Sequence, residues 1–193
     1  MGRARFEFSK LSLDGAYAIK NFYYDDIRGS FIKSYEKEIY ENAGISFEMT
    51  ETFVSVSCKN VIRGLHFQFC DPQAKLICLL KGEAWDVIVD LRRSSSTYKK
   101  WISVDLRSDG SNAVYIPPGF AHGFASLTDD MTMLYQCSGK YDKTTDTGIL
   151  FNDETIGIKW PIDLNKAVLS ERDLGLMDFE QFERKADYYG KYQ

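Results

Sequence analysis

The feature that most constrains this chain is a succession of short β-type segments separated by turn residues. In residues 85–91, large apolar side chains occupy every second position, with Asp86 and Asp90 between them. Residues 76–80, 113–116 and 131–137 form similar apolar runs, bounded by Gly, Pro and Asp. This pattern is typical of antiparallel sheets and not of alternating strands and helices. Because Lys81 and Gly82 form a turn-prone pair, we expect residues 76–80 and 85–91 to form a hairpin.

Helical patterns are confined to the flanks of the chain. Residues 34–42 are rich in Glu and Lys, and Asp178 could cap a helix that buries Phe179, Phe182 and Ala186. Many short strands with short peripheral helices predict an all-β fold, a jelly roll or a related barrel. At 193 residues, the chain is long enough for one domain, which we expect to span residues 1–193.

The net charge and the lack of long apolar runs argue against nucleic acids and membranes as partners. The chain has 24 basic and 28 acidic side chains, a net charge of −4, so no broad positive field is available to bind a nucleic acid. No run of about 18 apolar residues suggests a membrane span. The N-terminal segment lacks the apolar core of a signal peptide, so we expect a cytoplasmic protein. Four scattered cysteines without a C-x-x-C pair make disulfides and a cysteine-built zinc site unexpected.

Only two histidines occur, His66 and His122, which makes each of them informative. His66 lies three residues after Arg63 and nine before Lys75, so a potential base, a guanidinium and an ammonium are grouped along one β-type stretch. The alternative is a core histidine beside ordinary surface charges. In a regular strand Arg63 and His66 would point to opposite faces, unless Gly64 marks a bulge.

The usual metal site of small β-barrels has three histidine ligands, so the two histidines of this chain are too few to build it. The position where a second ligand would follow His66 is Gln68. We therefore expect no metal, although a site of both histidines and a carboxylate stays open on ligand count. The sequence has neither G-x-G-x-x-G nor a P-loop motif, so no cofactor is expected.

Segments over nearly the whole chain resemble the dTDP-4-dehydrorhamnose 3,5-epimerases. The most specific are Arg-Gly-Leu-His at 63–66 and Gly-Phe-Ala-His-Gly-Phe at 119–124. The others are 26–31, 61–62, 67–68, 75–76, Gly82, 86–92, 96–97, 116–118, Tyr135, Tyr141, 151–153, 160–161 and 169–173. The resemblance implies a metal-free, cupin-type jelly-roll barrel, a homodimer, and a nucleotide-sugar substrate whose carbons beside a C4 ketone are inverted.

The resemblance also implies catalytic roles. His66 matches the base, and its ordinary pKa of about 6.5 suits work at neutral pH. Asp173 matches the carboxylate that pairs with this base, and Lys75 the cation beside the C4 oxygen, where the enolate charge develops. Tyr135 matches the acid on the opposite face of the sugar, with Tyr141 as its rival.

The remaining assignments concern substrate binding. Arg63 resembles a substrate-anchoring arginine, and His122 with Asp86 resembles a second, supporting pair. Arg28 and Phe31 match positions that meet the nucleotide. The other residues that we assign to substrate binding are Gln68, Tyr141, Lys33 and Glu51.

Three residues depart from the family at the nucleotide end. Lys33 stands where an acidic residue is common, Glu51 where Gln is common, and Phe53 where Asn is common. Exchanging an acceptor for a cation alters the recognition of a base, so dTDP, CDP and GDP all stay open, as does inversion at C3, at C5 or at both. Other functions left open are a metal-dependent cupin oxygenase, a sugar 3,4-ketoisomerase and a non-catalytic sugar-binding jelly roll.

Overall fold

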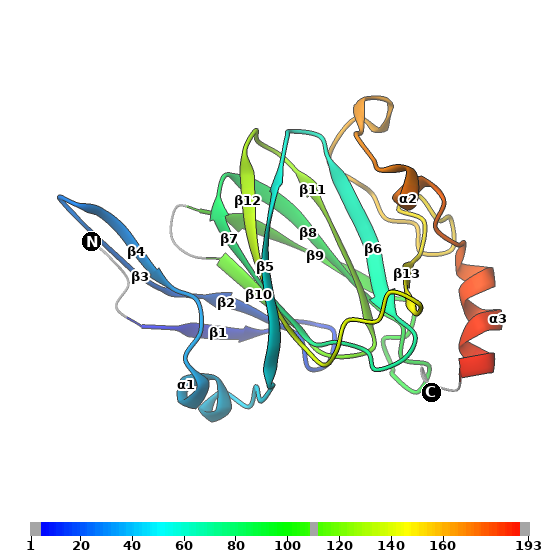
Figure 1. Ribbon diagram of the computed structural model, residues 1–193, viewed down its shortest axis with the longest axis horizontal. Coiled ribbons are helices and arrows are strands. Elements are labelled where there is room, and N and C mark those ends of the chain that lie inside the picture. The colour runs from blue at the N-terminus through cyan, green and yellow to red at the C-terminus, as the bar shows by residue number, and fades with distance from the viewer. Residues whose placement is uncertain (1–4, 109–111, 190–193) are drawn as a thin grey trace.

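Two antiparallel sheets pack face to face in the computed structural model, which describes residues 5–108 and 112–189 (Figure 1). Within these residues, one sheet has six strands in the order β1 (Glu7–Lys10), β2 (Tyr17–Lys20), β10 (Asn112–Ile116), β7 (Lys75–Lys81), β12 (Met131–Ser138) and β5 (Met49–Ser57). The other has five, in the order β13 (Asp146–Gly148), β6 (Ile62–Gln68), β11 (Phe120–Ser126), β8 (Glu83–Asp90) and β9 (Trp101–Arg107). This sandwich confirms the all-β jelly-roll prediction.

The main core lies between the two sheets, and strict alternation along the strands builds it. On β12, Met131, Met133, Tyr135 and Cys137 all point inward, as their shared parity predicts. They meet apolar side chains of the other sheet, such as Ile88 of β8. Burial on this inner face fixes the register of each strand, because a shift by one residue would expose the whole apolar set.

The short helices cover the outer faces of the sheets. Helix α3 (Phe179–Tyr189) lies along the five-stranded sheet (Figure 1) and buries Phe179, Phe182 and Ala186. Asp178 caps it by accepting a hydrogen bond from the Gln181 amide at 2.7 Å, as predicted. Helix α1 (Lys37–Asn42) covers the six-stranded sheet and is shorter than the predicted 34–42. Residue 34 stays outside the helix, and its carbonyl accepts a hydrogen bond from the hydroxyl of Tyr40.

The predicted hairpin of residues 76–80 and 85–91 is wrong, although both strands exist. β7 pairs with β10 and β12, whereas β8 pairs with β9 and β11, so the chain crosses between sheets at Gly82. The physical reason is burial on both faces. Residues 76–79 and 86–90 are all buried, which a strand pair with one solvated face would not achieve.

A bulge at Gly64 brings both ends of the Arg-Gly-Leu-His motif to one side, which is the alternative that the sequence analysis left open. The pairing of β6 with β11 shifts register between His122 and Phe124. Gly64 has a φ of +119°, and a Cβ at this position would lie 2.5 Å from the Cα of Gly123. Only glycine fits this close approach. As a result, Arg63 and His66 face the same cavity.

An arm formed by β3 (Phe22–Asp26) and β4 (Gly29–Lys33) projects from the sandwich (Figure 1). It exposes Tyr24, Ile27 and Phe31. At the other end of the chain, the 3-10 helix Leu164–Lys166 and helix α2 (Glu171–Leu174) precede α3. Across the described part of the chain, no helix is long and apolar enough to cross a membrane.

Candidate active site

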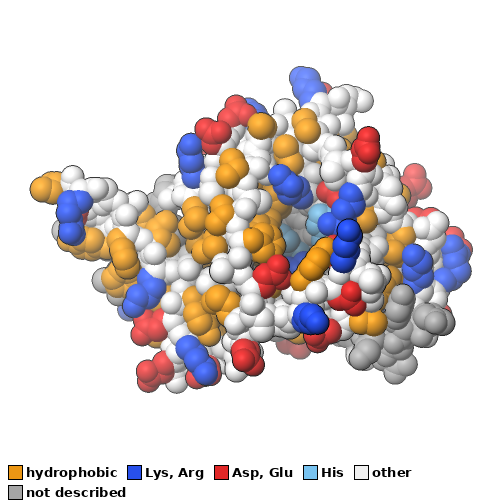
Figure 2. Space-filling model, viewed as in Figure 1, with side chains coloured by type: hydrophobic (Ala, Val, Ile, Leu, Met, Phe, Trp, Pro, Cys, Tyr) orange, Lys and Arg blue, Asp and Glu red, His pale blue; other side chains and the backbone are white. Residues whose placement is uncertain are grey.

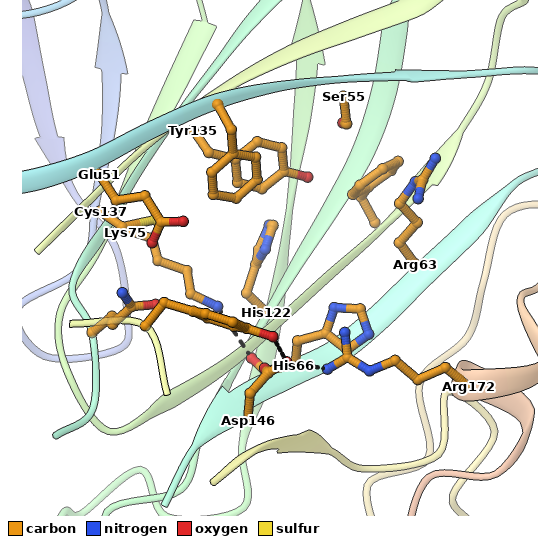
Figure 3. A pocket seen from close by; sticks show the side chains of 14 residues that line it. Glu51, Ser55, Arg63, His66, Lys75, His122, Tyr135, Cys137, Asp146 and Arg172 are labelled. Atoms are coloured by element: carbon orange, nitrogen blue, oxygen red, sulfur yellow. Dashed lines mark hydrogen bonds and ion pairs between the residues drawn. The ribbon is translucent and has the colours of Figure 1, made fainter. Parts of the chain in front are cut away.

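A cavity of about 360 Å³ opens between the two sheets. Figure 2 shows it as a hollow in which histidine is visible, with basic side chains at its rim. The cavity is lined by Glu51, Phe53, Ser55, Arg63, His66, Gln73, Lys75, His122, Phe124, Tyr135, Cys137, Tyr141, Asp146 and Arg172 (Figure 3). Seven of the twelve residues that the sequence predicts for catalysis or substrate binding are in this set, namely His66, Tyr135, Lys75, Arg63, His122, Tyr141 and Glu51.

The predicted base and acid project from opposite walls of this cavity. His66 and His122 are directly paired across β6 and β11, in the five-stranded sheet. Lys75 and Tyr135 stand on the neighbouring strands β7 and β12 of the six-stranded sheet. A planar substrate between these walls would therefore meet His66 on one side and Tyr135 on the other.

His66 is paired with Asp173, as predicted. Its Nε2 lies 2.7 Å from Oδ1 of Asp173, which is buried and also accepts a 3.3 Å hydrogen bond from the Gly64 amide. Burial of Asp173 opposes its ionisation, but the hydrogen bonds from His66 and Gly64 outweigh it and lower its pKa. Burial lowers the pKa of His66 against the opposing effect of Asp173. The lowered pKa favours the neutral form of His66 at pH 7, and in that form a proton on Nε2 is donated to Asp173 and the lone pair is on Nδ1.

A second pair stands beside the first, because His122 is the cross-strand neighbour of His66. His122 Nε2 lies 2.8 Å from Oδ2 of Asp86, and both side chains are buried. Burial raises the pKa of Asp86, against the opposing effects of His122 and Lys75. Asp86 itself does not line the cavity. This arrangement fits the predicted supporting role of the pair, since Asp86 holds the ring of His122 in the cavity wall.

Lys75 is the cation placed deepest in the site. Its Nζ donates a 3.4 Å hydrogen bond to the backbone carbonyl of His66, so it reaches across the cavity to the opposite wall. Burial lowers the pKa of Lys75, while Cys137 and Asp146 oppose this shift. A desolvated ammonium stabilises a nearby negative charge more strongly than one in water.

The two candidate acids, Tyr135 and Tyr141, have different environments. Tyr135 is 8% exposed and belongs to the core between the sheets, and burial raises its pKa. Tyr141 is 49% exposed, and its hydroxyl donates a 3.1 Å hydrogen bond to Oδ2 of Asp146. Both line the cavity, but only Tyr135 stands on the wall that faces His66. This placement favours Tyr135 as the acid.

Five predicted residues do not line the cavity. Asp173 stands behind His66, whereas Arg28, Phe31 and Lys33 lie on the arm, where Arg28 pairs with Asp26 and Lys33 with Glu36. Gln68 is buried on β6. Its amide donates to the carbonyl of Lys140 at 3.1 Å and accepts from the backbone amide of Asp142 at 2.8 Å. In this structure Gln68 therefore holds the loop that carries Tyr141.

The sequence of this chain matches a family of known enzymes. The family model described as dTDP-4-dehydrorhamnose 3,5-epimerase matches residues 10–181. The dTDP-4-dehydrorhamnose 3,5-epimerase of Methanothermobacter thermautotrophicus is 40% identical over 171 residues, which cover 88% of this chain and 92% of that protein. This chain belongs to the dTDP-4-dehydrorhamnose 3,5-epimerase family. It is thus an epimerase, which confirms the family and the enzyme class that the sequence predicts.

Two solved structures of this epimerase family are close in fold. One is the dTDP-6-deoxy-D-glucose-3,5-epimerase of Legionella pneumophila in complex with dTDP-4-keto-L-rhamnose. Its TM-score is 0.89 at 31% identity, covering 94% of this chain and 97% of that one. The other is the 3'-monoepimerase ChmJ of Streptomyces bikiniensis in complex with dTDP-quinovose. Its TM-score is 0.83 at 31% identity, covering 94% and 96%. The match confirms the cupin-like jelly roll.

The epimerase site also contains residues that the sequence analysis did not assign. Arg172 donates a 2.8 Å hydrogen bond to Oδ2 of Asp146, and together with Tyr141 they form one cluster at the cavity (Figure 3). Cys137 and Ser55 line the wall near Tyr135. The sequence could have indicated Cys137, because it lies two residues after Tyr135 and side chains two apart in a strand point to the same face. Asp146 and Arg172 are 26 residues apart, and no local pattern links them.

Within residues 5–108 and 112–189, no group of three or more His, Cys, Asp or Glu side chains is arranged to hold a metal ion. His66 and His122 each direct Nε2 to a separate carboxylate. These two ring nitrogens therefore already have hydrogen-bond partners within the protein.

Proposed function

We propose that this protein inverts C3, C5 or both in a nucleotide-linked 4-keto-6-deoxyhexose by proton transfer beside the C4 ketone. The observation that carries this proposal is the placement of His66 and Tyr135 on opposite walls of one cavity that also holds Lys75. A proton beside a ketone leaves only when a base lies against it and the developing enolate oxygen is stabilised.

The reaction has two proton transfers. Nδ1 of neutral His66 takes the proton from carbon, and the electron pair of that bond moves into an enolate whose oxygen is stabilised by Lys75. Asp173 stabilises the imidazolium that forms. Tyr135 then donates its phenolic proton to the same carbon from the other side, which inverts the centre. Solvent finally removes the proton from His66 and restores the proton of Tyr135.

The charges of the cavity favour a substrate that carries phosphate. Besides Lys75, which is assigned to the C4 oxygen, Arg63 and Arg172 line it, and guanidinium groups are usual ligands of a diphosphate. The Legionella relative was solved with dTDP-4-keto-L-rhamnose, and ChmJ with dTDP-quinovose. We therefore propose a nucleoside diphosphate sugar as the substrate, with dTDP as the first nucleotide to test.

The test is incubation with dTDP-, CDP- and GDP-linked 4-keto-6-deoxy sugars in D₂O, followed by NMR at C3 and C5. The proposal predicts that deuterium enters at one or both carbons with inversion of configuration for at least one nucleotide. A shifted carbonyl in the product would indicate a 3,4-ketoisomerase instead. If no substrate takes up deuterium, the epimerase proposal is wrong for these sugars.

A single-carbon epimerase is the second candidate, favoured by the similarity to ChmJ, which is named a 3'-monoepimerase. The same base and acid can act at one carbon or at two. The NMR experiment separates these cases, because deuterium would appear at C3 alone for a monoepimerase and at both C3 and C5 for a 3,5-epimerase.

We also propose a homodimer in which the arm of one subunit completes the site of its partner. Arg28, Phe31 and Lys33 match nucleotide-binding positions, yet none of them lines the cavity of its own chain. They lie on the arm that projects from the sandwich (Figure 1). Tyr24, Ile27 and Phe31 of the arm are exposed, and so are Val54 and Val56 on the outer face of edge strand β5. Exposed apolar groups of this kind favour association with a second copy.

Subunit mixing tests the shared site. His66→Asn removes the base, and Arg28→Ala removes an arm contact, so each homodimer should be impaired. In a mixed dimer, the intact arm of the His66→Asn subunit would complete the site of the Arg28→Ala subunit, and activity should rise above the mean of the two homodimers. Activity equal to that mean, or a monomer by sedimentation, would refute the shared site.

A further inference from the structure

We propose that Phe53 is a positioning residue that holds the phenol of Tyr135 in the orientation from which it protonates the substrate. This inference rests on the proposed function, in which Tyr135 is the acid. It assigns a role to Phe53, which lines the cavity and stacks on the ring of Tyr135.

The strand register places the two rings together. Phe53 of β5 is directly opposite Tyr135 of β12 in the antiparallel pairing. Their rings are nearly parallel, at an interplanar angle of 10°, and their centroids are 4.6 Å apart. Cross-strand aromatic pairs of this kind restrict each other's rotamers.

Phe53 also covers Tyr135 from solvent. Phe53 is 45% exposed and Tyr135 only 8% exposed, although both line the cavity. β5 is the edge strand of its sheet, so Phe53 forms the outermost part of this wall. On another side of the phenol, the centroid of the His122 ring lies 6.1 Å from that of Tyr135, and the two ring planes make an angle of 70°. The phenol is thus held between Phe53 and a ring of the opposite sheet.

The two rings constrain where the phenolic proton can be delivered. His122 is fixed by its 2.8 Å contact with Asp86, so its edge is a rigid boundary. Phe53 supplies the boundary on the side of the edge strand. Without this ring, Tyr135 could turn toward the mouth of the cavity, and displacement of about 1 Å from a productive geometry slows a reaction on the order of a hundredfold.

The substitutions Phe53→Leu and Phe53→Met remove the ring but keep an apolar side chain. Phe53→Tyr keeps the ring and should retain the stack. Leu80→Ala is the matched control, because Leu80 is an exposed apolar residue of β7 in the same sheet and does not line the cavity. Thermal unfolding checks that each variant is folded.

The measurement follows deuterium uptake and inversion together by NMR in D₂O. We expect both Phe53→Leu and Phe53→Met to slow inversion on the order of tenfold to a hundredfold. Deuterium uptake, which needs only His66, should slow much less, and the loss should fall on kcat and not on KM. Phe53→Tyr and Leu80→Ala should behave like the wild type.

Three results would overturn the inference. These are equal slowing of uptake and inversion in folded Phe53→Leu and Phe53→Met, a change in KM alone, and wild-type behaviour of both variants. Failure of the proposed function looks different, because the wild-type protein itself would then take up no deuterium.

Discussion

At the scale of single residues, the site depends on which groups are charged at neutral pH. His66 must be neutral to accept a proton, and burial keeps it so by lowering its pKa. Lys75 must be charged to stabilise an enolate, and burial acts against this by lowering its pKa as well. Asp173 supports the base, since its carboxylate lies 2.7 Å from Nε2 of His66 and stabilises the imidazolium that forms on proton transfer.

These directions predict the pH profile of kcat/KM. Activity should fall at low pH, as His66 becomes protonated, with a midpoint below the ordinary histidine value of about 6.5. It should fall at high pH, as Lys75 loses its proton, with a midpoint below the ordinary lysine value of about 10.5. Tyr135 does not set the alkaline limb, because burial raises its pKa.

Lys75→Arg tests the assignment of the alkaline limb, because a guanidinium stays charged throughout this range. The residual activity of this variant should lose its alkaline fall or move it to higher pH. Lys81→Arg, an exposed lysine at the end of the same strand, is the control and should keep the wild-type profile. An unchanged alkaline limb in Lys75→Arg would show that another group controls it.

At the scale of elements, the bulge of β6 places the base. A Cβ on Gly64 would lie 2.5 Å from the Cα of Gly123, in a backbone conformation with positive φ. We expect Gly64→Ala to lower the free energy of unfolding by about 1–3 kcal/mol through overpacking, and to displace His66. Denaturant unfolding and turnover measure the two effects.

Gly29→Ala is the matched control for this prediction. Gly29 has a similar φ of +115°, but nothing lies within 4 Å of an added Cβ. Its variant therefore reports the backbone strain alone. If Gly29→Ala costs as much stability as Gly64→Ala, crowding against Gly123 is not the cause.

Helix α3 stabilises the fold through an aromatic cluster. Phe182 is fully buried, and its ring lies 5.4 Å from that of Phe67 and 5.3 Å from that of Phe179. Phe182→Ala should lower the free energy of unfolding by about 3–5 kcal/mol. Gln181→Ala, an exposed neighbour in the same helix, should change it little, and equal effects of the two would contradict the packing of α3.

At the scale of the whole molecule, the strands could be predicted and their partners could not. The period of two and the turn residues are local, so residues 85–91 already indicate a strand and its two faces. Pairing is decided by burial between distant segments, which is why β7 and β8 lie in different sheets. The same holds for the site. His66 and Tyr135 could be assigned from the resemblance to the family, whereas the contact of Arg172 with Asp146 exists only in the folded chain.

Metal dependence is also a property of the whole enzyme. The site proposed here stabilises the enolate with Lys75 and fixes both histidines on carboxylates. Prolonged dialysis against EDTA should therefore leave the rate of epimerisation unchanged. Loss of activity that a divalent metal ion restores would require a metal at this site and would contradict the prediction.

The central claim is that deprotonation and reprotonation occur from opposite walls, and Tyr135→Phe tests it most directly. With the acid removed, His66 can still take a proton and return a deuteron to the same face. Deuterium uptake from D₂O should therefore persist while inversion falls much further, and Tyr141→Phe should not show this separation. If uptake and inversion fall in equal proportion in Tyr135→Phe, or if Tyr141→Phe alone separates them, Tyr135 is not the acid and the two-wall account is wrong.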